Sequence, residues 1–170
     1  MGRKFAIFRT AKVKDWNVFN RLVRHSERSG DTPPTNVDKE RTKLNRRLFS
    51  KPSGEKAAKT RWKKRVGKQK MRMNAVLALE LFLGLSDGVV MSPEKLRNWQ
   101  AANLRWVRKT FGPRNLIAGA SNLDEKTPHL HVIIVPLTKN GKLNCRNFLG
   151  NAAKLSDLHD SYAKAMDSNK

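Results

Sequence analysis

The sequence predicts an α+β fold, a two-layer sandwich with a mainly antiparallel sheet. Short apolar segments of strand length alternate with longer segments whose apolar residues recur at helical spacing. Residues typical of tight turns connect some of the predicted strands directly, as is usual for neighbouring antiparallel strands. The resulting order of strand, helix, strand, helix, strand, strand and helix is typical of the α+β class.

The N-terminal elements are a strand and an amphipathic helix. Residues 3–9 contain the apolar run Phe5 to Phe8 and predict a strand. A helix is predicted from Asp15 to about Arg28, because apolar side chains form one stripe there. The stripe consists of Trp16, Phe19, Leu22 and Val23.

A basic, partly irregular segment is predicted over about residues 29–72. Proline and glycine turn signals lie near both ends of its first half, at 30–34 and 51–54, and favour an irregular, partly extended chain. Lysines and arginines are dense from Lys39 to Arg72, and such charge runs are usually solvated or disordered. Because Trp62 lies inside this run, a segment that tracks a DNA backbone is the functional alternative.

The second half of the chain carries the clearest signals. Residues 73–83 are nearly continuously apolar and predict a buried strand. Ser92-Pro93-Glu94 begins a helix that should end at about Phe111, before Gly112-Pro113. Two strands follow at 115–122 and 129–137, then an Asn140-Gly141 turn with residues 142–145 returning. A last helix carries Leu155, Leu158, Tyr162 and Met166 on one stripe.

The charge indicates a polyanionic partner. The formal net charge is +22 over 170 residues, so nucleic acid is the first partner to consider and an anionic membrane the second. A length of 170 residues suits a single domain, residues 1–170. No apolar stretch approaches the roughly 20 residues of a membrane-spanning helix. The lone Cys145 and the lack of a secretory signal favour a reducing, cytoplasmic location and exclude a cysteine-rich zinc site.

The segment His129-Leu130-His131 is a candidate chelating pair. Residues two apart on a strand project from the same face, so both imidazoles can reach one ion. Glu125 or Asp124 and the amide oxygen of Asn122 could complete a mixed nitrogen and oxygen set, suited to Mn²⁺ or Mg²⁺. Alone, such a pair is more often structural or incidental, and the nearby acids and the high charge favour the metal site.

These residues resemble the MobV/Pre plasmid mobilisation and recombination relaxases, a branch of the HUH endonucleases. The family segment has the pattern His-Leu-Asp-Glu-x-Thr-Pro-His-x-His before an apolar strand, and residues 123–131 match it. The first family histidine is replaced here by Asn122. His25-Ser26-Glu27-Arg28 is similar to the family's His-Asn-Glu-Arg element, and two shorter matches lie near Arg41 and Arg72. The resemblance implies an HUH-relaxase-like fold.

The resemblance also implies that His25 attacks the scissile phosphate and forms a 5′-phosphoramidate. Its place on the flank of the helix stripe fits an exposed group, whereas Tyr162 lies on a core stripe. Arg28 and Arg72 are candidates to hold the phosphate. Glu27 could orient His25, although pairing with Arg24 or another arginine is slightly favoured. We predict DNA contacts by a set of arginines: Arg24, Arg41, Arg46, Arg47 and Arg72.

The leading functional hypothesis is metal-dependent, site- and strand-specific nicking and strand transfer at a plasmid origin of transfer. The partner would be the origin's hairpin and single strand, in a bacterial cytoplasm. Full-length family members continue beyond this region, so a homodimer would form outside this chain, and no membrane contact is expected from this domain. The alternatives are a DNA-binding or replication-regulating module with a decayed metal site, and a protein that coats nucleic acid by charge alone.

Overall fold

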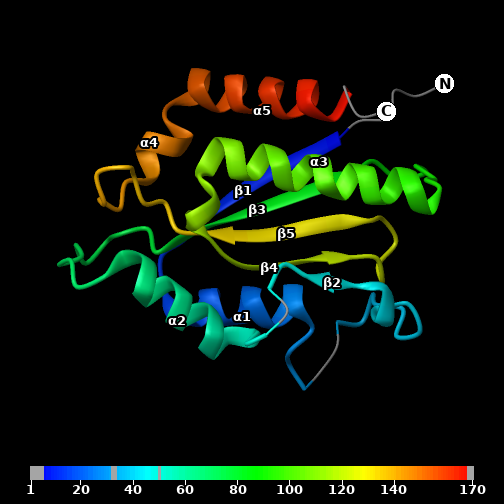
Figure 1. Cartoon of the computed structure of the whole chain (residues 1–170), viewed down its shortest axis with the longest axis horizontal. Helices are drawn as coiled ribbons and strands as arrows, with labels where there is room; N and C mark the ends of the chain where they lie inside the picture. Colours follow the sequence, from blue (N-terminus) through cyan, green and yellow to red (C-terminus); the bar gives the residue numbers. More distant parts are fainter. Residues whose placement is uncertain (1–5, 32–33, 50, 168–170) are drawn as a thin grey trace.

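A five-stranded antiparallel sheet forms the centre of the computed structural model (Figure 1), which describes residues 6–31, 34–49 and 51–167. The strand order is β1-β3-β5-β4-β2, and every neighbouring pair is antiparallel. The strands are β1 (Ala6–Val13), β2 (Arg46–Arg47), β3 (Ala78–Leu85), β4 (Leu116–Asn122) and β5 (His129–Ile134). The α+β class and the antiparallel sheet are therefore confirmed.

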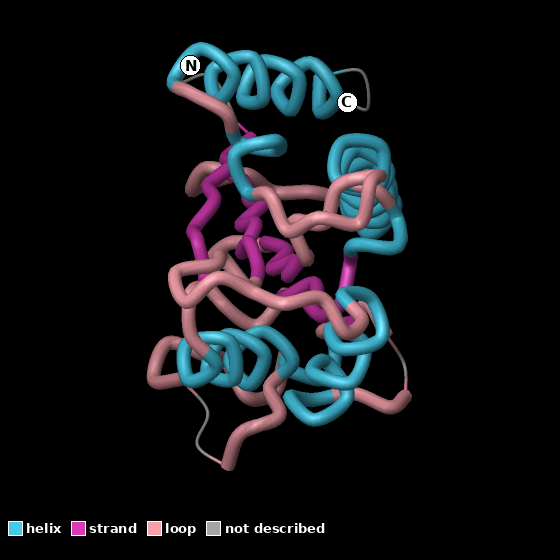
Figure 2. The backbone as a smooth tube through the Cα atoms, turned by 90° about the vertical axis from the view of Figure 1, so that its left-hand side faces the viewer, coloured by secondary structure: helices cyan, strands magenta, loops and turns pink. Residues whose placement is uncertain are grey.

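Helices cover both faces of this sheet, which adds a layer to the two that the sequence predicts. α1 (Trp16–Glu27) and α2 (Gly54–Val66) lie on one face, and α3 (Pro93–Phe111) and α5 (Ala152–Asp167) lie on the other (Figures 1 and 2). Three short helices complete the chain: η1 (Thr42–Leu44), η2 (Pro113–Asn115) and α4 (Cys145–Leu149).

Each face of the sheet has its own hydrophobic core. The leucines of β3 alternate along the strand, and those at 79, 81, 83 and 85 pack with α3 and α5. Val13, Ala78 and Ile133 pack against α1 and α2 on the opposite face. The core on the side of α1 and α2 does not extend to the end of the sheet at which β5 begins. Polar side chains lie there instead. That end of the sheet holds the candidate site.

The two helices with the clearest caps agree closely with their predictions. The Asp15 side chain accepts hydrogen bonds from Asn17 and Val18 and caps α1. Ser92 is the N-cap of α3, Pro93 is the first residue of the helix, and Gly112 is its C-cap. For β1, predicted at 3–9, residues 3–5 lie outside the described residues and the strand continues to Val13.

Helix α2 was not predicted, because its many charged residues leave only a narrow apolar face and so a weak periodic pattern. That side is made of Ala57, Ala58, Trp62 and Val66. Trp62 is 4% exposed and donates a hydrogen bond from Nε1 to the Leu77 carbonyl at 2.8 Å. Its ring packs edge-on against Trp16. The interpretation of Trp62 as a residue that grips DNA is therefore wrong, since it is a core residue.

Two strand boundaries also differ from the predictions. Strand β3 begins at Ala78 rather than residue 73, and Met73 is fully exposed, because the chain makes a turn at Arg72–Ala75 first. Residues 142–145 form only an isolated bridge between Leu137 and Leu143, and Cys145 already begins α4. In the described part of the chain, no helix is both long and apolar enough to cross a membrane.

Candidate active site

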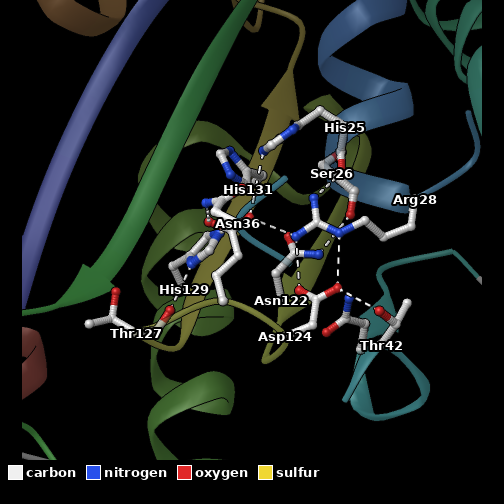
Figure 3. A network of polar contacts seen from close by, with 12 residues as sticks. His25, Ser26, Arg28, Asn36, Thr42, Asn122, Asp124, Thr127, His129 and His131 are labelled. Carbon is white, nitrogen blue, oxygen red and sulfur yellow. Dashed lines mark hydrogen bonds and ion pairs between the residues drawn. The ribbon is translucent and has the colours of Figure 1, made fainter. Parts of the chain in front are cut away.

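Three histidines from two elements meet at one end of the sheet. His129 and His131 project from the same face of β5, and their ring centroids are 5.0 Å apart. His25, in the last turn of α1, lies edge-on to His131 with a centroid distance of 5.3 Å. Figure 3 shows the three imidazoles facing a common space. The predicted strand pair and the predicted helix histidine are thus brought together.

In both strand histidines, Nδ1 has a hydrogen-bond partner that orients the ring. Nε2 of each ring is then directed toward the site. His129 Nδ1 is 2.9 Å from the Thr127 carbonyl, and His131 Nδ1 is 3.0 Å from Glu80 Oε1 on β3. Phe82 stacks on His129 at 5.0 Å between centroids. Such outer partners fix the tautomer and orientation of histidines that bind metals. Glu80, which interrupts an apolar strand, is therefore a positioning group for His131.

Glu125 lies between His25 and His129. Its Oε1 is 3.9 Å from Nε2 of each of these two histidines. Arg28 Nη2 donates to the same oxygen at 2.7 Å, and Asn36 Nδ2 donates to Oε2 at 3.0 Å. The hydrogen bonds from Arg28 and Asn36 therefore hold the Glu125 carboxylate beside the histidines.

Asn122 is a completely buried residue opposite His129 on the neighbouring strand. Its Nδ2 donates to the Ser26 carbonyl at 3.0 Å, one residue after His25 (Figure 3). Its Oδ1 is buried and has no hydrogen-bond partner among the described residues. Leaving such an atom unpaired costs about 1–3 kcal/mol, so an oxygen-binding ligand would stabilise it.

Arg28 fixes the loop that carries the acidic residues. It adopts the left-handed conformation that ends α1, at φ 48° and ψ 45°. Its guanidinium donates to both carboxylate oxygens of Asp124, at 3.0 and 2.8 Å, and to the His25 carbonyl at 2.6 Å. With Glu125 as a further acceptor, few of its donors remain free. We therefore correct the assignment of Arg28 to the scissile phosphate: it is a positioning residue.

Asp124 is the buried centre of this network. Burial alone would raise the pKa of Asp124, but hydrogen bonds from Arg28 and Thr42, the charge of Arg28 and the nearby Asn45 amide outweigh it and hold the pKa at about 2. The backbone of Asp38 also donates to the Asp124 carbonyl at 2.7 Å. The ionised carboxylate thus joins the end of α1, the segment around residues 38–45 and the loop between β4 and β5.

The donors at this site suit a divalent cation. Two imidazoles, the Glu125 carboxylate and the free oxygen of Asn122 make a mixed nitrogen and oxygen set, which matches Mn²⁺ or Mg²⁺ better than a thiophilic ion. Within the described ranges, no three His, Cys, Asp or Glu side chains already converge as a closed set of ligands.

The surroundings of His25 favour the neutral form of its imidazole. Burial lowers its pKa below the ordinary value of 6.5, and the nearby charges of His131 and Arg28 lower it further. Its side chain is 36% exposed, so one edge reaches solvent. A neutral, accessible imidazole has a lone pair available for nucleophilic attack.

Glu27, which we predicted among the catalytic residues, points away from His25. It is 2% exposed, and its carboxylate accepts hydrogen bonds from Gly54 at 2.7 Å and from Gly119 at 3.4 Å. It joins the start of α2 to β4, so its place in the catalytic set is corrected to a structural one. It does not pair with Arg24 either, because Arg24 pairs with Glu55 at 3.0 Å.

Four of the five arginines predicted to contact DNA lie near this end of the sheet. Arg24 precedes His25 on α1, and the others lie around η1 and on β2, which pairs with the site end of β4. These others are Arg41, Arg46 and Arg47. Arg47 also donates to the Glu27 carbonyl at 2.9 Å. Arg72 is separate, because its segment leads into the opposite end of β3.

A groove about 860 Å³ in volume opens beside His25. It runs between α1 and the segment of residues 34–42, and Arg21, Arg24 and Lys39 line it together with His25 and Arg28. Among the described residues, Arg21 and Lys39 make no ion pair. Their charges are free to meet an anionic ligand that leads to His25.

Tyr162, the only tyrosine, lies far from these groups in the α3–α5 core. It is 1% exposed, and its hydroxyl donates to Asn103 Oδ1 at 2.8 Å. Burial raises the pKa of Tyr162 well above its ordinary value of 10. We expect Tyr162→Phe to keep full activity while lowering the free energy of unfolding by about 1–2 kcal/mol, because Asn103 loses its partner. Chemical denaturation and a nicking assay measure the two effects, and a loss of activity without a loss of stability would contradict the assignment.

Several residues of the site carried no signal in the sequence. Asn36, Thr42 and Asn45 reach the acidic loop from about 80 residues away, and Phe82 reaches His129 from a neighbouring strand. Each is a common residue type in an ordinary context. Only the tertiary fold brings them to the histidines.

Known proteins share this sequence pattern over nearly the whole chain. A family model described as "Plasmid recombination enzyme", Mob_Pre, matches residues 3–170. A 65 kDa protein of Zymomonas mobilis is 34% identical over 169 residues, and the plasmid recombination enzyme type 1 of Staphylococcus aureus is 26% identical over 170. These alignments cover 96% and 92% of this chain, but only 28% and 40% of the relatives' own length.

Solved structures share the fold. The MobM relaxase domain (MOBV; Mob_Pre), Mn-bound and in complex with plasmid pMV158 oriT DNA at pH 6.8, aligns with a TM-score of 0.80. The two are 25% identical, and the alignment covers 96% of this chain and 86% of that one. A structure concerning vancomycin resistance transfer in Staphylococcus aureus aligns with a TM-score of 0.55 at 12% identity and resembles this chain in fold alone.

Proposed function

Because the chain belongs to the plasmid recombination enzyme family, Mob_Pre, we propose that it nicks one DNA strand at a plasmid origin of transfer and transfers that strand. The observation that carries the proposal is the gathering of three imidazoles and Glu125 beside a basic groove. In this proposal residues 1–170 act as one nicking domain. The reaction takes place in the bacterial cytoplasm, where the plasmid is.

The proposed metal ligands are His129, His131, Glu125 and the side-chain oxygen of Asn122. The oriented Nε2 atoms and the unpaired Asn122 oxygen support this set. The similar MobM relaxase domain is Mn-bound, which favours Mn²⁺, with Mg²⁺ as the other ion of suitable chemistry. A bound divalent ion would supply positive charge to the non-bridging oxygens of the scissile phosphate.

The proposed nucleophile is His25. A lone-pair nitrogen of its neutral imidazole forms a bond to phosphorus while the bond from phosphorus to the 3′ oxygen breaks. As the nitrogen–phosphorus bond forms, the proton on the other ring nitrogen becomes acidic and passes through solvent to the 3′ oxygen, which leaves as a free hydroxyl. The 5′ phosphate stays on His25 as a phosphoramidate. Strand transfer is the reverse attack by a 3′ hydroxyl. Support comes from the lowered pKa of His25 and from its position at the mouth of the groove.

The groove between α1 and residues 34–42 is the proposed path of the single strand. Arg21 and Arg24 lie on successive turns of α1 before His25, and Lys39 faces them from the other wall. Cations at the spacing of a helix face can follow a run of phosphates, and of these three only Arg24 is in an ion pair, with Glu55. Arg41, Arg46 and Arg47 are the proposed contacts beyond the groove.

A DNA-binding module without nuclease activity is the second candidate. Asn122, in the place of a family histidine, favours it, because three imidazole ligands would bind most divalent metals more tightly than two. The intact positions of His129, His131 and Glu125 favour the nuclease instead.

The test is metal-dependent nicking of supercoiled plasmid that carries the cognate origin. We expect nicked circles with Mn²⁺ or Mg²⁺ and none after chelation, because the phosphate charge is then not neutralised. Gel electrophoresis measures the conversion, and a plasmid without the origin is the control. Origin binding with no nicking at any metal concentration would support the DNA-binding module.

A further inference from the structure

Strands β1 and β3 carry an open face beside the histidines. Residues directly opposite each other on paired strands point to the same side, so Arg9, Phe82 and His131 form one row across β1, β3 and β5. Ala11 follows Arg9 on this face of β1, and both are exposed. In the described part of the chain, the core beneath α1 and α2 includes Val13 of β1 but neither Arg9 nor Ala11. This part of the sheet is therefore open to solvent.

The Phe82 ring has a defined place on this open face. It leans over Gly84, and a Cβ atom at position 84 would lie only 2.8 Å from the ring. Because unbonded carbon atoms lie about 3.5–4.0 Å apart, an alanine there would displace the ring. The ring stacks on His129 with 25° between the two planes, and the His131 ring lies edge-on to it at 5.4 Å. The half-buried Phe82 thus contacts both strand histidines.

Arg9 approaches Phe82 from the side away from the histidines. Strand β3 lies between β1 and β5, so Arg9 and His129 reach the ring from opposite neighbouring strands. The guanidinium carbon of Arg9 is 5.8 Å from the ring centroid. Among the residues that the structure describes, Arg9 forms no ion pair. Its charge is therefore available to a ligand that lies on or beside the ring.

An aromatic ring with an arginine beside it suits the binding of an unpaired nucleotide. Bases of single strands stack on aromatic rings, and arginine adds a contact to the backbone phosphate or to the ring itself. The contacts of Phe82 with His129 and His131 place it next to the proposed metal. A base on this ring would therefore belong to a nucleotide adjacent to the scissile phosphate.

The direction of attack decides which of the two adjacent nucleotides this is. In an in-line displacement, the attacking and leaving atoms lie on opposite sides of phosphorus. His25 contacts His131 from α1 and lines the basic groove, whereas Phe82 contacts His131 from β3, on the side of β1. The nucleotide whose phosphate stays on His25 then extends into the groove. The nucleotide whose 3′ oxygen leaves lies toward Phe82.

We propose that Phe82 and Arg9 bind the nucleotide that carries the leaving 3′ oxygen, with its base on Phe82 and its 5′ phosphate on Arg9. This inference rests on the proposed function, because it takes the single strand as the substrate. After cleavage, the same contacts keep the 3′ hydroxyl beside the phosphoramidate. In the reverse attack, the oxygen–phosphorus bond forms, the nitrogen–phosphorus bond breaks, and the hydroxyl proton returns to the imidazole of His25.

The experiment removes bases of the cognate origin strand one at a time, as abasic residues, across the nick site. Binding is measured by fluorescence anisotropy with a chelator, so that the strand stays intact. Phe82→Leu keeps an apolar side chain against His129 but has no ring, and Gly84→Ala keeps the ring but displaces it. Phe148→Ala removes a half-buried ring on α4, outside the site, and is the matched control.

We expect one base to depend on Phe82, the base of the nucleotide immediately 5′ to the scissile phosphate. Its loss should weaken binding to the wild-type chain about tenfold. Phe82→Leu and Gly84→Ala should each bind the intact strand about tenfold more weakly, and removal of this base should then have no further effect. Phe148→Ala should match the wild-type chain.

Two further readouts separate the ring from the arginine and from the metal. Arg9→Ala should weaken binding of the intact strand and of the strand without this base equally, by about threefold, and should lower the log–log salt slope by about 0.7. Phe82→Leu should bind Mn²⁺ with nearly wild-type affinity in calorimetry, because it keeps the packing on His129. With Mn²⁺ present, its rate of rejoining should fall relative to its rate of nicking.

Four results would overturn the proposal. These are an equal loss from the abasic residue in Phe82→Leu and the wild-type chain, dependence on Phe82 at a base on the 5′-phosphate side, the same loss in Phe148→Ala, and an unchanged ratio of rejoining to nicking. Failure of the wild-type chain to nick the strand would count against the proposed function. The abasic scan needs no metal, so it would still show whether one base depends on Phe82.

Discussion

Replacement of His25 by alanine is expected to abolish nicking and the covalent adduct, with a loss of at least about a thousandfold in rate. Apart from the proposed metal ligands His129 and His131, no other histidine, tyrosine or cysteine of the described chain lies at the site to replace it. Tyr162 is buried with its hydroxyl on Asn103, and Cys145 lies at the start of α4, away from the histidines. The fold should be little affected, because the His25 side chain is 36% exposed and its ring makes no close hydrogen bond to another side chain.

Two measurements check this expectation. The first is the rate at which supercoiled plasmid becomes nicked, and the second is the detergent-stable adduct between the chain and a 5′ end. A phosphoramidate is cleaved by acid, whereas a phosphotyrosine survives it. His159→Ala is the matched control, since His159 lies on the exposed side of α5, where its ring packs on Phe8. Nicking by His25→Ala at the wild-type rate, or an acid-stable adduct lost in Tyr162→Phe, would refute the role of His25.

Periodicity predicted the elements in which one residue pattern dominates. The start of α3 at Pro93 and its end at Phe111 could be predicted, because a cap, a proline and a terminal glycine mark them locally. Helix α2 could not, because its four buried residues are scattered among nine others, mostly charged or small. Its stability comes from packing of Trp62 on Trp16, a contact between distant segments.

In the candidate site, too, some features could be predicted from the sequence and others could not. Alternation along β5 predicted that His129 and His131 share a face, since that follows from the strand alone. The orientation of the imidazoles could not be predicted, because Glu80 and Phe82 act on them across a strand pairing. Arg28 was assigned to phosphate because an arginine beside a nucleophile suits that role. Its real partner, Asp124, is 96 residues away.

Asn122→His is expected to change the metal preference of the site. The substitution adds a third imidazole in the position that the family pattern gives to histidine, opposite His129 on β4. Nitrogen ligands favour Zn²⁺ and Co²⁺ over Mn²⁺, following the general order of divalent affinities. We expect Zn²⁺ affinity to rise by at least about tenfold relative to Mn²⁺, as measured by calorimetric titration.

Two further variants separate the role of the oxygen from the role of the amide nitrogen. Asn122→Asp keeps an oxygen ligand but loses the donor to the Ser26 carbonyl, so Mn²⁺ should still bind while the position of His25 loosens. Asn122→Leu removes both groups, so Mn²⁺ should bind more weakly and raise the melting temperature less than in the wild-type chain. Equal Mn²⁺ affinity in the wild-type chain and Asn122→Leu would remove Asn122 from the ligand set. His129→Ala is measured in parallel. If it loses Mn²⁺ binding, His129 remains in the ligand set even when Asn122 does not. If the expected order holds, the same amide binds the ion through its oxygen and α1 through its nitrogen, so that metal binding and the position of His25 are linked through one side chain.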